Sequence, residues 1–248
     1  MASTLPLSLV EIEYYDAAQR YLRSLPPEHF MEAFPQGTQR MITIASLQLL
    51  RDQRPDVYVF NELLVQYPLQ GRKIGQVVPD NMVVISEAPL IVEGSFDLPL
   101  QPEGPFLVLE YVSQNSKRKD YVDNKGKYEQ DLKVPYCLLF YPEKQDLKLL
   151  KYDKETGYHA VVANKRGRMP IPKLELEVAL HEEWVRFWFR GELLPLPADL
   201  LLELDETKRL LAGEREALAG EREARIAAEH EVERLRALLE KHGDLPPP

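Results

Sequence analysis

Hydrophobic positions recur at two different spacings along this chain, and the spacing changes near residue 56. Within residues 9–24 and 43–54, apolar side chains return every three or four positions, which predicts two amphipathic helices. A polar turn at 35–38 is expected just before the second helix. The first helix is assigned to an N-terminal helical extension, residues 1–25.

From residue 56 onward, β-branched and aromatic residues form short runs separated by Pro and Gly, a pattern typical of strands. The strands at the start of this region are expected to form a meander, and the later ones to include a hairpin and a last strand after a helix at 120–132. The predicted strands lie at 57–65, 81–86, 106–112, 136–141, 147–152, 158–162 and 184–189. Strands mixed with helices predict an α/β or α+β fold, with a mixed central sheet flanked by helices, for residues 26–195.

Beyond residue 198 the chain becomes rich in Leu, Glu, Arg and Ala, and a seven-residue segment at 212–218 is repeated at 219–225 with one change. Apolar residues at intervals of seven, three and four predict a coiled-coil helix over 199–242 that makes the chain a homo-oligomer, in the simplest case a dimer. The alternative is a solvated single helix, because Gly213 and Gly220 each cost about 1 kcal/mol relative to Ala. Residues 243–248 are expected to be a disordered end.

Length and charge limit the possible functions. A chain of 248 residues with 44% hydrophobic content can bury one sizeable core and carry an appendage. The formal net charge of −9 means that a nucleic-acid partner would need a local basic patch. The sequence contains no apolar run that predicts a membrane span, so a cytoplasmic location is expected. The single cysteine, Cys137, is predicted to be a buried apolar residue and excludes an internal disulfide.

Two carboxylates stand out by their positions relative to predicted strands. Glu110 interrupts an otherwise apolar strand, where an unpaired buried carboxylate costs several kcal/mol unless another group or a metal ion compensates it. The alternative is an edge strand on which Glu110 faces water. Asp80 directly precedes the strand predicted at 81–86. Asp56 also follows a proline and is kept as a secondary candidate.

The order of short motifs along the chain carries a resemblance. Pro79-Asp80 is followed by Leu-Glu-Tyr-Val-Ser at 109–113, by Asp120 with a helix, and by a Pro-rich apolar segment at 134–142. This order resembles the Uma-two family of endonuclease-like proteins, a branch of the PD-(D/E)XK nuclease superfamily, over roughly residues 26–190.

The resemblance implies a restriction-endonuclease-like fold and a metal-dependent hydrolysis of DNA phosphodiester bonds. Asp80 and Glu110 would bind Mg²⁺ or Mn²⁺ together with the backbone carbonyl of Tyr111, and Glu32 is a weaker candidate near the site. Hard oxygen ligands of this kind suit both cations, which can activate a bound water.

The lysine that assists the attacking water in that superfamily is displaced in this sequence. It would lie two residues after Glu110, where Val112 stands, or in the Uma-two branch at the position of Asn124. Lys125 and Lys127 are the nearest lysines and are therefore the candidate catalytic lysines.

A short basic run, Lys117, Arg118 and Lys119, supplies the local patch that a DNA partner would need. The same run is also compatible with an ordinary solvated surface compensated by neighbouring acidic residues. Three functions therefore remain open: a dimeric DNA endonuclease, a catalytically inactive nuclease-fold module for binding or assembly, and a structural oligomerisation protein with an unrelated head. The residue Asn124 and the acidic net charge favour the second.

Overall fold

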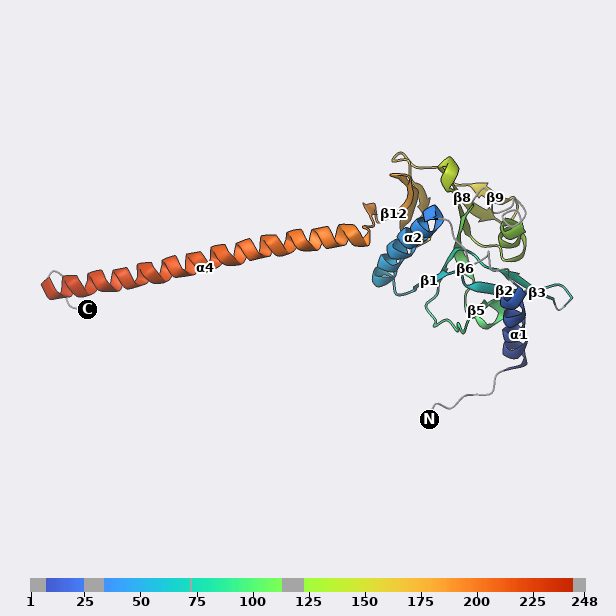
Figure 1. Cartoon of the computed structure of the whole chain (residues 1–248), viewed down its shortest axis with the longest axis horizontal. Helices are drawn as coiled ribbons and strands as arrows, with labels where there is room; N and C mark the ends of the chain where they lie inside the picture. The colour runs from blue at the N-terminus through green and yellow to red at the C-terminus, as the bar shows by residue number, and fades with distance from the viewer. Residues whose placement is uncertain (1–7, 25–33, 72, 113–122, 243–248) are drawn as a thin grey trace. The chain divides into compact units, whose positions relative to one another are not determined.

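A computed structural model describes residues 8–24, 34–71, 73–112 and 123–242 of the chain (Figure 1). The chain divides into two compact units, Met1–Leu194 and Pro195–Pro248, which are treated separately below. The predicted segment 243–248 lies outside the described residues. No helix within the described ranges is both long enough and apolar enough to cross a membrane.

The first unit is organised around a six-stranded mixed sheet with the order β1-β4-β6-β7-β8-β9. The pair β6 and β7 is parallel, and the other neighbouring pairs are antiparallel. A parallel pair requires a crossover connection, and here it contains helical residues 123–126 and the π-helical turn η3 (Lys127–Asp131). The strands are β1 (Val57–Asn61), β4 (Asn81–Ile85), β6 (Pro105–Tyr111), β7 (Tyr136–Tyr141), β8 (Asp146–Asp153) and β9 (Gly157–Ala160).

Two smaller sheets flank this central sheet. The sequence predicted the central sheet but not these two. One has the order β3-β2-β5, and the other the antiparallel order β10-β11-β12-β13. Their strands are β2 (Leu64–Leu69), β3 (Lys73–Val77), β5 (Ser95–Asp97), β10 (Met169–Ile171), β11 (Leu176–His181), β12 (Trp184–Phe189) and β13 (Glu192–Leu193). Short 3-10 turns follow three of the strands: η2 (Leu98–Leu100), η4 (Pro142–Lys144) and η5 (Pro172–Leu174).

The strand predicted at 57–65 is in fact two strands. Glu62 adopts a left-handed backbone conformation with φ of 48°, which a non-glycine residue rarely adopts. The chain therefore leaves the central sheet after β1, and β2 joins the smaller sheet. The three strands predicted as a meander, β1, β4 and β6, are neighbouring and antiparallel, but β2, β3 and β5 intervene along the chain and form the smaller sheet. Strands β8 and β9 form the predicted hairpin.

Helix α1 (Leu9–Ser24) packs on the β3-β2-β5 sheet and belongs to the first compact unit. Tyr14, Ala17 and Ala18 are buried on its inner face. The side-chain amides of Gln66 and Gln76 donate hydrogen bonds to the carbonyls of Tyr14 and Ala17 at 2.7 and 3.1 Å. These bonds tie the predicted N-terminal extension to the sheet.

Helix α2 (Phe34–Gln53) begins nine residues before the predicted start at 43, so the predicted turn at 35–38 is wrong. Pro35 stands in the first turn of the helix, where its missing N–H costs little. Gln39 is buried and exchanges two hydrogen bonds with the backbone of Val185 in β12, at 3.1 and 2.8 Å. This exchange fixes the rotation of α2 about its own axis.

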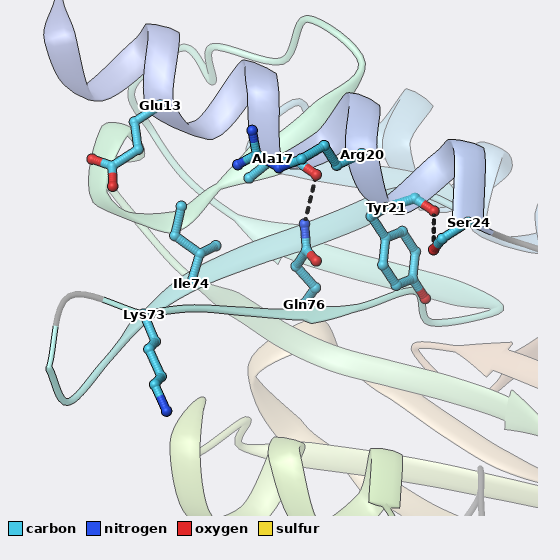
Figure 2. Close-up of a pocket in the computed structure, with 8 residues that line it drawn as sticks. All are labelled: Glu13, Ala17, Arg20, Tyr21, Ser24, Lys73, Ile74 and Gln76. Atoms are coloured by element: carbon cyan, nitrogen blue, oxygen red, sulfur yellow. Dashed lines mark hydrogen bonds between the residues drawn. The ribbon is translucent and has the colours of Figure 1, made fainter.

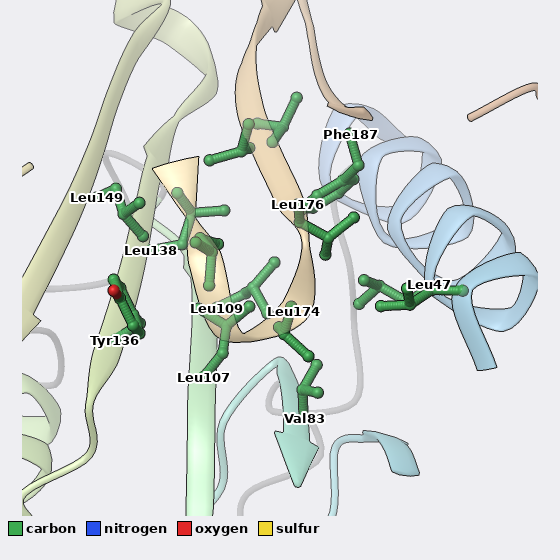
Figure 3. Packing of buried hydrophobic residues seen from close by; sticks show 14 of the residues in the cluster. Leu47, Val83, Leu107, Leu109, Tyr136, Leu138, Leu149, Leu174, Leu176 and Phe187 are labelled. Carbon is green, nitrogen blue, oxygen red and sulfur yellow. The ribbon is translucent and has the colours of Figure 1, made fainter. Parts of the chain in front are cut away.

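Two hydrophobic clusters lie on opposite faces of the central sheet. On one face, side chains such as Leu107 and Leu109 of β6 pack with α2 and the β10–β13 sheet (Figure 3). On the other face, Val108 packs with Cys137 and Tyr128. Cys137 is fully buried, which confirms the prediction from its apolar surroundings. Because side chains alternate along a strand, Glu110 points to the same face as Val108.

The second unit contains the helix α4 (Pro197–His242), 46 residues long. Every residue of this helix whose side chain is described is exposed, including its leucines. The predicted helix is therefore present, whereas its pairing with another helix remains a prediction.

Candidate metal centre

Strand register brings Asp80 and Glu110 together. Strands β4 and β6 are antiparallel, and Asn81 pairs with Leu109. One further step along both chains places Asp80 opposite Glu110, and directly opposed side chains point to the same face of a sheet. The two carboxyl groups are in hydrogen-bond contact. The pairing predicted from motif order is thus present in the structure.

Three oxygens of Asp80 are held by hydrogen bonds. Its Oδ2 accepts a hydrogen bond from the backbone N–H of Tyr111 at 2.7 Å, and its Oδ1 accepts one from Nη2 of Arg40 at 3.2 Å. Its backbone carbonyl accepts the N–H of Glu62 at 3.2 Å. Arg40 also forms an ion pair with the Glu62 carboxylate at 2.6 Å. The carboxyl group of Asp80 therefore has a fixed orientation and a cationic neighbour.

Arg40 lies at this site because of its position on helix α2. Gln39, the preceding residue, is locked to β12, so the position of Arg40 on the helix is set by buried hydrogen bonds. One turn further on, the Tyr111 hydroxyl donates a hydrogen bond to Oδ1 of Asn81 at 2.5 Å, and it lies within hydrogen-bond distance of the Thr43 hydroxyl at 2.8 Å. These contacts join α2, β4 and β6 around Asp80.

Glu110 is held from the opposite side by the crossover helix. The hydroxyl of Tyr128 donates to Oε1 of Glu110, and the side chain of Asn124 also hydrogen-bonds to this carboxyl group. Asn124 and Tyr128 are four residues apart, so both lie on one helix face. Tyr128 is fully buried and belongs to η3. A π-helical turn is a frequent feature of functional sites.

The pKa values of both carboxyl groups are raised, and the charge of Asp80 contributes to the shift at Glu110. Burial raises the pKa of Glu110 well above its usual value, and the neighbouring charge of Asp80 raises it further, against hydrogen bonds from Tyr128 and Asn124 that lower it. Burial also raises the pKa of Asp80, while the N–H of Tyr111 and the charge of Arg40 lower it. Because both pKa values are raised, the metal-free pair favours a bound proton, and a divalent cation would compete with that proton.

The predicted lysines are engaged at other places. Nζ of Lys125 forms an ion pair with Glu129 at 3.6 Å, and Nζ of Lys127 donates to the backbone carbonyl of Gln76 at 3.0 Å. It is Asn124, the residue at the position of the family lysine, that contacts Glu110. The catalytic roles predicted for the two lysines stay predictions.

Several other candidates are not positioned by the structure or lie elsewhere. Glu32 and the basic run at 117–119 lie outside the described residues. Asp56 stands at the opposite end of β4, because its neighbour Val57 pairs with Ile85. Both carboxylate oxygens of Asp56 accept from Arg54, at 2.8 and 2.6 Å. Asp56 is therefore part of a surface ion pair and not of the carboxylate pair.

The donor set at Asp80 and Glu110 is compatible with Mg²⁺ or Mn²⁺. Across the described ranges, no group of three or more His, Cys, Asp or Glu side chains is arranged to hold a metal ion. Mg²⁺, however, is commonly bound by one or two carboxylates with water in its other positions. The backbone carbonyl of Tyr111 stays a predicted third ligand, and the N–H of the same residue binds Asp80.

An open groove of about 560 Å³ lies between α1 and β3, apart from the carboxylate pair (Figure 2). Figure 2 shows Gln76 pointing toward the Ala17 carbonyl, to which it donates a hydrogen bond. The groove is lined by charges of both signs, from Glu13, Arg20 and Lys73. This mixture does not favour any one class of ligand.

Sequence reasoning missed two of the residues that shape the site. Arg40 lies in a helix whose start was placed too late, and no motif marked it. Tyr128 is four residues after Asn124, and this helical spacing is the signal that could have identified it as a second contact of Glu110.

Comparison with known proteins gives no family. No protein-family model and no curated protein matches the chain. A solved structure from Anabaena variabilis ATCC 29413, described as a candidate nuclease belonging to DUF820, is similar at a TM-score of 0.45 and 15% sequence identity. The match covers 63% of this chain and 89% of that one. A likeness of this size assigns neither a family nor an activity.

Proposed function

We propose that the first unit is a metal-dependent, nuclease-like phosphodiesterase domain that acts on DNA. The observation that carries this proposal is the hydrogen-bonded pair of Asp80 and Glu110 at neighbouring strand positions, with the pKa of Glu110 raised well above its usual value. A pair of carboxyl groups held so closely is stabilised by a cation, and perturbed carboxyl groups cluster at functional sites.

Each residue of the site then has a role. Asp80 and Glu110 would hold Mg²⁺ or Mn²⁺, which would polarise a phosphodiester and lower the pKa of a bound water. Asn124 and Tyr128 fix the orientation of the Glu110 carboxyl group. Arg40 offsets part of the negative charge at Asp80 and is therefore a positioning residue.

The proposed DNA partner rests on the basic run Lys117, Arg118 and Lys119, which follows β6 in the sequence. A chain with a net charge of −9 requires such a local patch to approach the phosphate backbone. Removing these charges should weaken DNA binding and reduce its dependence on salt concentration.

A second candidate function is a metal-binding but catalytically inactive module. Its specific support is that Asn124 contacts Glu110 at the position of the family lysine. An asparagine side chain cannot act as a general base or supply a positive charge. In this case the carboxylate pair would bind a cation without cleaving DNA.

The two functions are separated by nicking of supercoiled plasmid DNA with Mg²⁺ or Mn²⁺. The variants Asp80→Asn and Glu110→Gln keep the shape of the side chains and should abolish nicking. Asp56→Asn is the matched control, because Asp56 also follows a proline and precedes a strand of the same sheet. Metal binding without nicking by the wild-type protein would favour the inactive module. Nicking that persists in both site variants would contradict the assignment of this site.

A further inference from the structure

Helix α4 displays a line of apolar residues, interrupted by a few charges, whose described side chains are all exposed. Leu211, Leu218, Val232, Leu235 and Leu239 are between 46% and 57% exposed. A long helix with a single apolar line is marginal in water and is normally stabilised by packing that line against another surface.

The line follows the period of a coiled coil. The contact positions alternate in steps of four and three, which keeps one stripe of the helix turned toward a partner. They are residues 207, 211, 214, 218, 221, 225, 228, 232, 235 and 239. Three of these contact positions carry charges: Glu214, Glu221 and Arg225.

These charges disfavour a parallel, in-register dimer. In that arrangement each contact residue faces the same residue of the other copy. Glu214, Glu221 and Arg225 would each oppose an identical charge in a partly desolvated layer, and like charges in such contacts are destabilising.

We propose that α4 pairs with α4 of a second copy of this chain in antiparallel orientation, in the register that places Arg225 opposite Glu221. Two-fold symmetry then forms this ion pair twice at the centre of the contact. Leu211 faces Leu235 of the second copy, and Leu218 faces Ala228. Glu214 faces Val232 near the end of the contact, where its carboxylate can reach water.

Charges at the two ends of α4 support the same orientation. Its first ten residues, 197–206, contain four acidic and no basic residues, whereas residues 234–242 contain three Arg or Lys and one Glu. Antiparallel pairing directs each acidic end toward the basic end of the second copy, and in the proposed register residues 204–206 lie beside residues 240–242. Beside the contact line, Leu210 then lies next to Leu238 of the second copy.

The ion pair that Arg225 makes within its own helix does not oppose this pairing. Arg225 contacts Glu229 at 3.4 Å, and the two side chains are 78% and 66% exposed. An exposed pair of this kind contributes little, so its replacement by a partly desolvated contact with Glu221 of the second copy costs little.

Disulfide trapping tests the orientation directly. Leu211→Cys and Leu235→Cys are each made in the full-length chain with Cys137→Ala, mixed under reducing conditions and then oxidised. The mixture should form a cross-linked dimer, and neither variant alone should. Cross-linking within each variant alone would show a parallel pairing and overturn the proposal. A monomeric mass in sedimentation at all tested concentrations would overturn it as well.

Charge reversal tests the register. Arg225→Glu or Glu221→Arg should each weaken the dimer by about tenfold or more in Kd, and the double variant Glu221→Arg/Arg225→Glu should restore it. Arg209→Glu, on the opposite face of α4, is the matched control and should leave the Kd nearly unchanged. Single reversals without effect would contradict the proposed register. The Kd is measured without DNA or metal, so failure here leaves the proposal for Asp80 and Glu110 untouched.

Discussion

Charges lie among apolar residues in both units, at the carboxylate pair of the first unit and on the contact line of α4. The groups that compensate these charges differ between the two units. Around Asp80 and Glu110, compensation comes from the same chain, through Arg40, the Tyr111 N–H, Asn124 and Tyr128. Along α4, Glu221 and Arg225 are matched at contact positions only if a second copy is present. A charge among apolar residues therefore indicates a ligand site in one unit and a partner in the other.

The largest difference between the two units should appear when a leucine is shortened. Leu107→Ala in the fully buried core should lower the free energy of unfolding by about 2–5 kcal/mol, because it removes apolar contacts and leaves a cavity. Leu202→Ala in α4 is the control, since Leu202 is 72% exposed and is not one of the proposed contact positions. Urea unfolding of the first unit measures the free energy of unfolding of both variants. Equal losses for the two variants would contradict the description of α4 as solvent-exposed.

Removal of the Arg40 charge should have the next largest effect on the free energy of unfolding. Arg40→Met keeps the apolar stem of the side chain but leaves Asp80 and Glu62 without their cation, and we expect a loss of about 2 kcal/mol in stability. Arg190→Met removes an exposed pair with Glu175 and should lower stability much less. Chemical denaturation at neutral pH compares the two variants. A smaller effect for Arg40 than for Arg190 would show that Arg40 does not compensate the site.

Sequence patterns located the two carboxylates but not the residues that surround them. Glu110 was recognisable because a charge within an apolar strand must be compensated, and Asp80 because it precedes the neighbouring strand. Arg40 comes from α2, which is distant in sequence from both strands, and its approach depends on the contact between Gln39 and β12. A local pattern contains no information about such a contact.

The fold was predictable to a similar extent. Alternation and turn residues identified the strands of the central sheet, whereas the separation of β2 from β1 coincides with the left-handed backbone at Glu62. The sequence 169–181, which forms β10 and β11, was not predicted as strand. Two prolines, Pro170 and Pro172, interrupt its apolar pattern.

Glycine substitutions should have opposite signs in the two units. A methyl group added at Gly220 of α4 meets no neighbouring atom, so Gly220→Ala should stabilise the helix by about 1 kcal/mol. A methyl group at Gly75 of β3 would overlap the ring of Tyr67, so Gly75→Ala should destabilise the first unit. Circular dichroism during thermal unfolding, at one fixed protein concentration, measures both. A stabilising Gly75→Ala variant would contradict the packing of Tyr67 against β3.

The dependence of stability on pH should distinguish the site from surface carboxylates. The pKa of Glu110 is raised on folding, so its stabilising contribution is complete below its usual pKa near 4.5 and is lost as the pH rises through the folded-state value. The metal-free protein should therefore lose stability as the pH rises from the usual pKa of a glutamate through the folded-state pKa of Glu110. The variant Glu110→Gln should reduce that loss.

The contribution of Asp56 to stability should depend on pH in the opposite direction. Its pKa is lowered by the hydrogen bonds from Arg54, so its contribution is present above its usual pKa near 3.8 and is lost as the pH falls. Asp56→Asn should thus alter stability only on the acidic side. Urea midpoints measured between pH 3 and 8 would reveal both trends, and an unchanged profile for Glu110→Gln would contradict the raised pKa.

Calorimetric titration with Mn²⁺ tests the central claim most directly, because it measures the metal site without any requirement for catalysis. The wild-type chain should bind one Mn²⁺ and release a proton, detected as a dependence of the heat on the buffer, since the cation replaces the proton on Glu110. Asp56→Asn should bind like the wild type, and Glu110→Gln should bind at least about tenfold more weakly, a loss of roughly 1.4 kcal/mol. Equal Mn²⁺ affinity of Glu110→Gln and the wild type would contradict the assignment of Asp80 and Glu110 as a metal centre.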